Sequence, residues 1–398
     1  MQNLLFSFLN VLKSIHRLWC KIRGIKQEDV HSERVVSGKA WDDFCDQLKT
    51  AGAALMYPGA PDDPFQQAEG VRYLTRLTRA ALEAFVEYND PAFPVFRRMV
   101  HETVKMGADN PDNHYFNAQI SGDFEYRILG KRNTIHYLGF FTQNGNYGTT
   151  GKMTPCGKLE HTDLEINSDG SFEIILSKSK KGKNWLKIET RTGLVIVRQT
   201  FLNRSIETPA ELFIENMDGR KSPDPLTPGL IDSGLKTASF FVAGAPVLFA
   251  RWAKGFQKHT NQLPLFDPET SNEAGGDASI FYYHSHWKLN LDEALVIDVK
   301  PPDCDSWNFQ LNNYWMESLD YRYFHVCINK AGARYNDDGS VTVIVAHQQP
   351  GHPNWIETAG HVEGTMCWRW YRLGPGELPV TPLCRLVKIQ DLLSKVIF

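Results

Sequence analysis

DGSFEIILSKSKKGKNWLKIETRTGLVIVR, residues 169–198, returns later in the chain as DGSVTVIVAHQQPGHPNWIETAGHVEGTMCWR, residues 338–369. Asp-Gly supplies the positive φ of a tight hairpin turn, so each copy predicts a turn, a strand, a loop and a second strand. The offset of about 170 residues is too long for a solenoid repeat and indicates a duplicated domain. The clearest matches pair Trp185 with Trp355 and Arg198 with Arg369.

Strand-like alternation of apolar and polar residues surrounds both copies. The alternating runs are short and are separated by Gly, Asn and Asp, which is typical of antiparallel strands with one buried face. We therefore expect an α+β, mainly β protein with two related antiparallel lobes. Lobe one is expected over 110–217 and lobe two over 275–375.

Helical patterns precede and separate the two lobes. Apolar residues recur at three- and four-residue steps over 41–106, which predicts a helical lead whose last helix runs from Val95 to Met106. Thr227-Pro228 is typical of a helix start and opens a predicted helical connector over 227–262. We also expect a polar linker over 26–40, a bend of the connector at 244–246 and a short closing helix over 383–398.

Residues 1–25 predict an amphipathic N-terminal helix. Its positive charges follow the apolar run, whereas those of a signal peptide precede it, and the run is too short to span a bilayer. Two interpretations remain: a helix docked on this protein or on a second copy in a homodimer, which we favour, and a helix lying on a membrane surface. The expected location is the cytoplasm, and the second interpretation adds a position peripheral to the inner membrane.

Composition excludes several classes of protein. The 398 residues carry 43 basic and 46 acidic side chains, a net charge of −3, which argues against a nucleic-acid partner. The seven cysteines are odd in number and form no CxxC, which argues against a disulfide framework or a zinc knuckle. No phosphate-binding or dinucleotide-binding glycine motif occurs, so we expect no cofactor.

The segments WNFQLNNYWMESLDYR (307–322) and NDDGSVTVIVAHQQPGHPNWIETAGH (336–361) resemble the domain-of-unknown-function family 1214. GVRYLTRL (70–77) and NPDNHYFNAQI (110–120) look like the lead-in segments of long bacterial members. The resemblance covers most of residues 40–373. It implies two β-sandwich, jelly-roll-like lobes with helical additions. It brings no catalytic residues, because the family has no shared established activity.

Four residues are candidates for acid–base chemistry. His347 ends an apolar stripe in lobe two, where it is either a general base at a cavity mouth or a hydrogen-bonded structural histidine. Strand alternation places His284 and His286 on one face, which suits either a polar substrate-lining face or a metal; we expect no metal. Glu317 is the fourth candidate and lies in a run rich in aromatic residues.

These residues predict a cofactor-independent enzyme, a lyase or hydrolase, that acts on a hydrophobic small molecule, aromatic or steroid-like, in a cavity near lobe two. Two alternatives remain open. One is a non-catalytic protein that binds small molecules or carbohydrate, and the other is a metal-dependent enzyme that uses His284 and His286. The candidate substrate-binding residues are Tyr282, Tyr314, Trp315, Tyr321 and His352.

Overall fold

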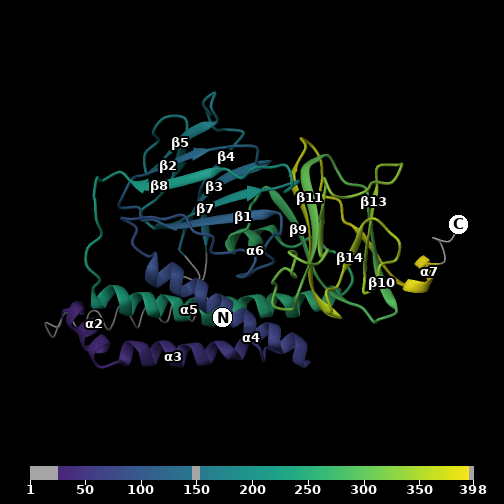
Figure 1. Cartoon of the computed structure of the whole chain (residues 1–398), viewed down its shortest axis with the longest axis horizontal. Helices are drawn as coiled ribbons and strands as arrows, with labels where there is room; N and C mark the ends of the chain where they lie inside the picture. The colour runs from purple at the N-terminus through teal and green to yellow at the C-terminus, as the bar shows by residue number, and fades with distance from the viewer. Residues whose placement is uncertain (1–25, 146–152, 394–398) are drawn as a thin grey trace.

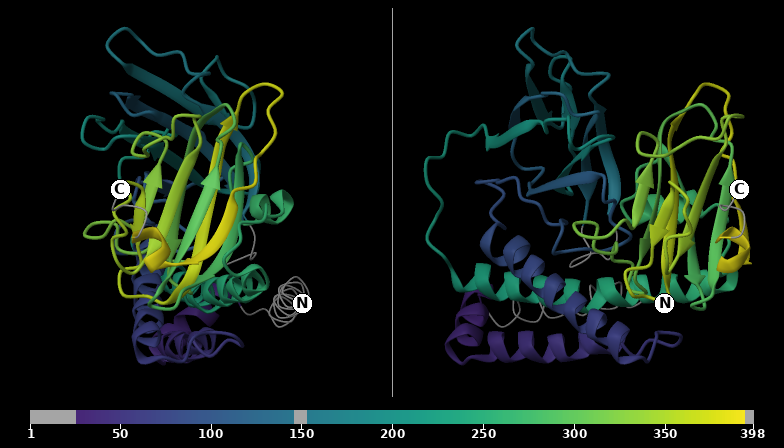
Figure 2. Two further views of the ribbon diagram at one scale, coloured as in Figure 1. Left: turned by 90° about the vertical axis from the view of Figure 1, so that its right-hand side faces the viewer. Right: turned by 45° about the vertical axis from the view of Figure 1, so that its right-hand side comes forward.

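The computed structural model describes residues 26–145 and 153–393. Two β lobes stand side by side above a layer of helices (Figure 1; Figure 2). Lobe one consists of β1 (Asn113–Gln119), β2 (Tyr126–Lys131), β3 (Tyr137–Asn144), β4 (Thr154–Glu160), β5 (Ser171–Ser177), β6 (Trp185–Lys187), β7 (Thr192–Thr200) and β8 (Glu211–Asn216). Lobe two consists of β9 (Ile280–Lys288), β10 (Glu293–Val299), β11 (Cys304–Asn312), β12 (Cys327–Asn329), β13 (Val341–Ala346), β14 (Trp355–Glu357), β15 (Glu363–Leu373) and β16 (Leu383–Lys388).

The two lobes have the same topology, strand for strand. Lobe one contains the sheets β1-β7-β3-β4 and β6-β5-β2-β8, and lobe two contains β9-β15-β11-β12 and β14-β13-β10-β16. Each strand of lobe one therefore matches the strand eight places later. In both lobes all neighbouring strands are antiparallel except one short parallel pair, β5–β6 and β13–β14. This correspondence confirms the internal duplication and the two related, mainly antiparallel lobes.

The matched tryptophans occupy equivalent places. Trp185 opposes Ile175 in the parallel pair of lobe one, and Trp355 opposes Ile344 in lobe two. The indole Nε1 of Trp185 donates to the carbonyl oxygen of Ser177 at 3.2 Å, and that of Trp355 donates to Ala346 at 2.9 Å. Each indole thus fastens the short parallel strand to its neighbour.

Each lobe has a core between its two sheets, and strand alternation decides which side chains lie outside it. In β7, Val195 and Val197 point into the core, so Leu194, Ile196 and Arg198 lie on the outer face of the sheet. β15 repeats this arrangement, with Trp368 and Trp370 in the core. Arg369 is therefore on the outer face of its sheet.

The helical layer packs beneath both lobes. It consists of α2 (Gln27–Val36), α3 (Lys39–Ala51), η1 (Gly52–Ala54), α4 (Pro64–Leu82), the π-helix η2 (Glu83–Glu87), α5 (Pro228–Phe256) and η3 (Gln257–His259). The short α6 (Pro268–Glu273) lies above α5, between the two lobes (Figure 1). A short α7 (Ile389–Leu393) follows β16. The hydroxyl of Thr227 accepts from the backbone N–H of Leu230 at 3.2 Å, which confirms the predicted start of α5. The segment 228–259 is long and apolar enough to cross a membrane, but 61% of its most apolar window is buried inside the protein.

Three expectations about the helices were wrong or incomplete. The segment 26–40 contains α2, which is held on α5 by hydrogen bonds from Arg34 to Asp232, so it is not a linker. The stretch from Val95 to Met106 is not helical, because the backbone of Arg97 exchanges hydrogen bonds with Asn117 of β1. Residues 383–388 form strand β16. α5 continues without interruption through Pro246, and the bend at 244–246 stays a prediction. Residues 1–25 lie outside the described residues.

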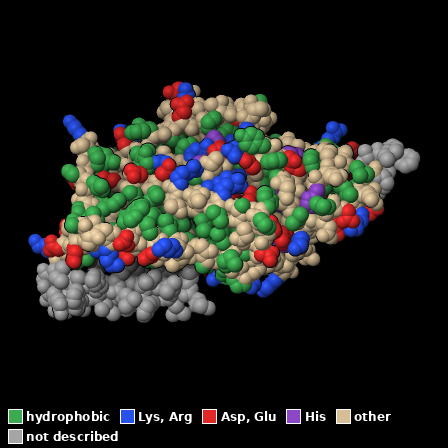
Figure 3. All heavy atoms as spheres, turned by 60° about the horizontal axis from the view of Figure 1, so that its bottom comes forward, with side chains coloured by type: hydrophobic (Ala, Val, Ile, Leu, Met, Phe, Trp, Pro, Cys, Tyr) green, Lys and Arg blue, Asp and Glu red, His purple; other side chains and the backbone are tan. Residues whose placement is uncertain are grey.

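Acidic and basic side chains are interspersed on the underside of the molecule (Figure 3). Hydrophobic side chains lie among them, and the described part of this face carries no continuous basic stripe. The mixed surface agrees with the small net charge of −3.

Candidate functional site

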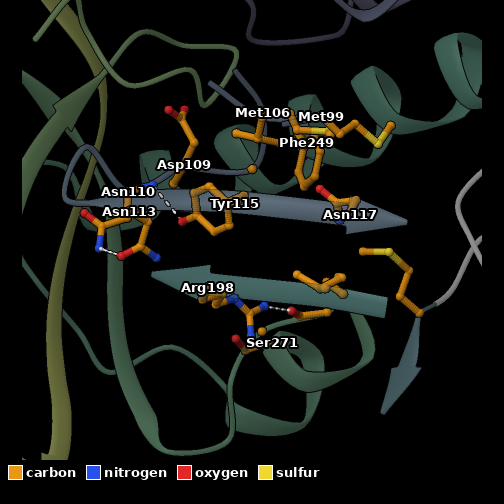
Figure 4. Close-up of a pocket in the computed structure, with 18 of the residues that line it drawn as sticks. Met99, Met106, Asp109, Asn110, Asn113, Tyr115, Asn117, Arg198, Phe249 and Ser271 are labelled. Carbon is orange, nitrogen blue, oxygen red and sulfur yellow. Dashed lines mark hydrogen bonds between the residues drawn. The ribbon is translucent and has the colours of Figure 1, made fainter. Parts of the chain in front are cut away.

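A cavity of about 200 Å³ lies where the outer faces of the two lobes meet the helical layer. Lobe one contributes side chains from β1 and β7, among them Tyr115 and Arg198 (Figure 4). Lobe two contributes side chains from the equivalent strands β9 and β15. Helix α5 and the loop before β1 complete the wall. Two equivalent strand pairs, β1–β7 and β9–β15, therefore line the cavity.

Apolar side chains form much of the wall. Phe249 and Trp252 come from α5, Ile196 comes from β7, and Met99 and Met106 come from the segment before β1 (Figure 4). Methionine adapts its shape to irregular partners and makes favourable contacts with aromatic rings. This part of the cavity suits the apolar body of a small molecule.

A tyrosine and an arginine face the cavity from each lobe. Tyr115 of β1 is the cross-strand partner of Arg198 in β7, and Tyr282 of β9 is the partner of Arg369 in β15. Directly opposed residues on one face of a sheet have side chains within contact reach. The duplication thus places two equivalent Tyr–Arg pairs around one cavity, together with Tyr371.

Neutral oxygen atoms hold both guanidinium groups. Arg369 is buried and donates to the side chain of Gln310 at 2.6 Å, to Asn308 at 3.3 Å and to the backbone carbonyl of Ala108. Arg198 donates to the carbonyl oxygen of Gly275 at 2.7 Å. Among the described residues, neither arginine has a carboxylate within salt-bridge distance. Each charge therefore lacks a direct anionic partner in the described part of the protein, although Asp109, Asp112 and Asp277 act on the two arginines from a greater distance.

The tyrosine hydroxyls at the cavity are hydrogen-bond acceptors from the protein. Tyr115 accepts from the backbone N–H of Asn110 at 3.0 Å, Tyr371 accepts from the side chain of Asn110 at 2.6 Å, and Tyr282 accepts from the N–H of Asp277 at 3.2 Å. No acceptor for their own protons lies within reach among the described residues. Burial raises the pKa of Tyr282 to about 12 and also raises those of Tyr115 and Tyr371, so all three stay protonated donors at neutral pH.

His284 is the histidine of the cavity wall. Its ring stacks on Tyr282 and Phe256, at centroid distances of 5.6 and 5.5 Å. Its Nδ1 is buried without a hydrogen-bond partner, and Nε2 lies 4.0 Å from the Sγ atom of Cys367. Burial, and then the charge of Arg369, lower the pKa of His284 to about 3. The imidazole is therefore neutral at physiological pH, and this residue of the cavity wall has one ring nitrogen without a partner.

The loop before β1 carries backbone strain beside Arg369. Gly107 and Ala108 both have positive φ, 64° and 56°, and this conformation is unfavourable for alanine. The N–H of Ala108 donates to Met316 at 2.7 Å, and its carbonyl accepts from Arg369. Strained backbone of this kind gathers at functional sites, where the surroundings hold it in place.

Several predicted site residues lie away from the cavity. Glu317 is buried in an ion pair with Arg76 of α4, at 2.7 Å. Trp315 packs against Gly70 of α4, and Tyr314 donates to the carbonyl of Ala250 in α5 at 3.4 Å. These residues fasten the helical layer to lobe two. Lys105 lies 4.5 Å from the ring centroid of Tyr321, which joins the core of lobe two.

The other predicted histidines have partners within the protein. His286 lies 3.0 Å from the Oγ1 atom of Thr260 and 3.3 Å from Glu363. His347 bonds to Thr358 at 2.9 Å and to the carbonyl of Leu289 at 3.3 Å, so both ring nitrogens are occupied. His352 accepts from the N–H of its neighbour Asn354 at 3.2 Å. Within the described residues, no three His, Cys, Asp or Glu side chains are grouped to hold a metal ion.

The structure brings together only Tyr282 and His284 of the nine predicted residues. The sequence reasoning missed Tyr115, Tyr371 and the roles of Arg198 and Arg369 at the cavity. One signal was available for the arginines, because a charged residue ends the apolar strand pattern at the same place in both copies.

Comparisons with known proteins found a family model and similar solved structures. A family model described as protein of unknown function (DUF1214) matches residues 146–201 and 293–375, one segment in each lobe. The chain is similar to an uncharacterised protein from Burkholderia cenocepacia, whose crystal structure shares 52% identity and a TM-score of 0.88, over 90% of this chain and 99% of that chain. A second crystal structure, of the VPA0106 protein from Vibrio parahaemolyticus, has 12% identity and a TM-score of 0.45. The match covers 86% of this chain and 100% of that chain. No curated protein matches the sequence.

Proposed function

The chain belongs to the DUF1214 family, and on this premise we propose that it binds a small, largely apolar organic molecule in the cavity between its two lobes. The observation that carries the proposal is the cavity itself, in which an apolar wall is combined with a few polar groups that face inward. Sites for small molecules commonly have this composition, with polar groups fixing the orientation of an apolar ligand.

The size of the cavity narrows the class of ligand. Pockets for drug-sized molecules occupy roughly 300–1,000 Å³, and this one occupies about 200 Å³. A body of one or two rings therefore suits the cavity better than a steroid. Phe249 and Trp252 favour an aromatic body, because aromatic rings stack on one another.

Acid–base catalysis on the bound molecule is a second candidate function, favoured by His284. Its unpartnered Nδ1 is a weak base, because the pKa of His284 is about 3, and the hydroxyl of Tyr282 is available to donate a hydrogen bond to a developing negative charge on oxygen. A lyase or hydrolase that needs no cofactor would use this pair of groups. Loss of a catalysed reaction in His284→Phe, with ligand affinity retained, would assign the step to His284.

Binding is tested with a neutral two-ring probe, 2-naphthamide, by isothermal titration calorimetry on the full chain. We expect the wild type to bind it at one site. Ile196→Trp should reduce the affinity at least about tenfold, because the larger side chain on β7 takes up the cavity.

The matched control is Phe213→Trp. This side chain lies on β8 and is 57% exposed, so the substitution adds an indole far from the cavity wall and should leave the affinity unchanged. Equal affinity in Ile196→Trp and in the wild type would place the probe elsewhere and would contradict the proposal.

A further inference from the structure

We propose that the cavity binds an organic acid and that Arg198, Arg369 and the surrounding tyrosines hold its carboxylate group. This inference rests on the proposed function and adds the chemical class of the ligand. Nothing in the family description assigns a ligand to this part of the fold.

The first argument is that the donors converge on one place. The backbone N–H of Asn110 donates to the hydroxyl of Tyr115 in lobe one at 3.0 Å, and its side chain donates to the hydroxyl of Tyr371 in lobe two at 2.6 Å, so hydroxyls of both lobes meet at one residue. The guanidinium carbon of Arg369 lies 5.8 Å from the ring centroid of Tyr282. The two equivalent pairs therefore share one region between the lobes, which suits a single anionic group rather than two separate ones.

The second argument is the balance of donors and acceptors. Three tyrosine hydroxyls retain protons without an acceptor, and Arg198 uses one of its five N–H donors on Gly275. A neutral hydroxyl or amide ligand would leave many of these donors unsatisfied. A carboxylate has two oxygen atoms and about four acceptor positions, and its pairing with arginine is short and strong.

The third argument is the balance of charge. Arg369 is buried and Arg198 is half-buried, and within hydrogen-bonding distance both are held only by neutral oxygen atoms. The buried carboxylates of Asp112 and of Asp109, which lines the cavity, attract Arg369 from a greater distance. The nearby Asp277 attracts Arg198 from a greater distance, and its Oδ1 lies 3.6 Å from Lys158. A bound anion supplies the missing direct partner.

The fourth argument is the orientation of the ligand in the cavity. Tyr115 and Arg198 project from neighbouring strands into the cavity, and Met99, Met106 and Phe249 lie along its other wall (Figure 4). A carboxylate placed between the arginines leaves the apolar body of the ligand against these side chains. We therefore expect a one- or two-ring aromatic acid.

The test compares 2-naphthoate with 2-naphthamide, which have the same ring system and differ in charge. Isothermal titration calorimetry at pH 7 on the full chain should show that the wild type binds 2-naphthoate about tenfold or more tightly than the amide. Arg198→Gln should reduce the preference to about twofold or less, with the affinity for the amide nearly unchanged. Tyr115→Phe, which retains the ring, should reduce the preference by a smaller factor if Arg198→Gln does not fold.

The outcomes separate the two proposals. Binding of 2-naphthamide with equal or weaker binding of 2-naphthoate would overturn the carboxylate site and would leave the proposed cavity function standing. A preference for the carboxylate that persists in both Arg198→Gln and Tyr115→Phe would place the anion elsewhere and would also overturn it. Failure of both probes to bind would contradict the proposed function and the carboxylate site together.

Discussion

At the residue scale, two arginines set the chemistry of the cavity. Arg198 and Arg369 occupy the same position of the two lobes, each beside a core-facing residue of its strand. Removing a guanidinium group from water is costly unless polar partners surround it. Gln310, Asn308 and backbone carbonyls supply these partners for Arg369. We attribute this cost in desolvation free energy to the role of the guanidinium groups in binding an anionic ligand.

The lowered pKa of His284 predicts how the stability of the protein depends on pH. Burial lowers its pKa in the folded protein to about 3, whereas an unfolded histidine titrates near 6.5. Below pH 6.5 the unfolded chain therefore binds a proton that the folded chain does not, so falling pH favours unfolding. His284→Phe retains an aromatic ring and removes this effect. Between pH 7 and pH 5 the wild type should lose about 2 kcal/mol of unfolding free energy relative to the variant.

Urea unfolding of the two proteins at both pH values measures this difference. A constant offset between the wild type and His284→Phe from pH 7 to pH 5 would show that the imidazole titrates in the folded state as it does in the unfolded state. It would contradict the environment described for His284, which is buried against Phe256 and Tyr282.

The sequence could predict one part of this site and not the other. Alternation within a strand is a local property, so it correctly placed Tyr282 and His284 on one face. Their neighbours Tyr115 and Arg198 come from the other lobe, more than 80 residues away along the chain. Local patterns do not show that the outer faces of two lobes meet, so the partners could not be identified.

At the element scale, a buried polar cluster fixes helix α4 to lobe two. The carboxylate of Glu317 pairs with Arg76 at 2.7 Å and accepts from Asn313 at 2.9 Å. Glu69, also on α4, lies 2.6 Å from Nε2 of His361 and accepts from Asn313 at 3.1 Å. Burial raises the pKa of Glu317, and the charge of Arg76 opposes that effect. The cluster explains why an acidic residue lies within the aromatic run of lobe two.

Glu317→Ala distinguishes a structural role from a catalytic one. The substitution leaves the mostly buried Arg76 without its partner, and breaking a buried ion pair typically costs about 3 kcal/mol or more. Urea unfolding should show a loss of this size. Asp46→Ala, which breaks the exposed pair with Lys49, is the control and should change the unfolding free energy very little. Near wild-type stability of Glu317→Ala would favour the catalytic interpretation instead.

Two elements were predicted incorrectly for the same physical reason. Residues 383–388 have an apolar pattern that also fits a helix, but the edge of β10 offers hydrogen bonds along the whole segment. Arg97 likewise finds backbone partners on β1. Pairing with a distant strand outweighs the weak local preference of a short segment. In contrast, Thr227-Pro228 specifies the start of α5 through local hydrogen bonds, and this start was predicted correctly.

At the scale of the whole molecule, duplication produces the site. Each lobe has its own complete core, so the outer face of the β1–β7 sheet and that of the β9–β15 sheet are free to line a cavity. Helix α5 lies beneath both lobes and closes the space between them (Figure 2). The repeat in the sequence established the two lobes, and the contact between them created a site that neither lobe contains alone.

The most direct test of this account is a crystal structure of the full chain saturated with 2-naphthoate. The account predicts one bound probe in the cavity, with its carboxylate between Arg198 and Arg369 and its rings against Phe249 and Trp252. An empty cavity in such crystals, or a probe bound only at another surface, would contradict the claim that the meeting of the two lobes forms a ligand-binding site.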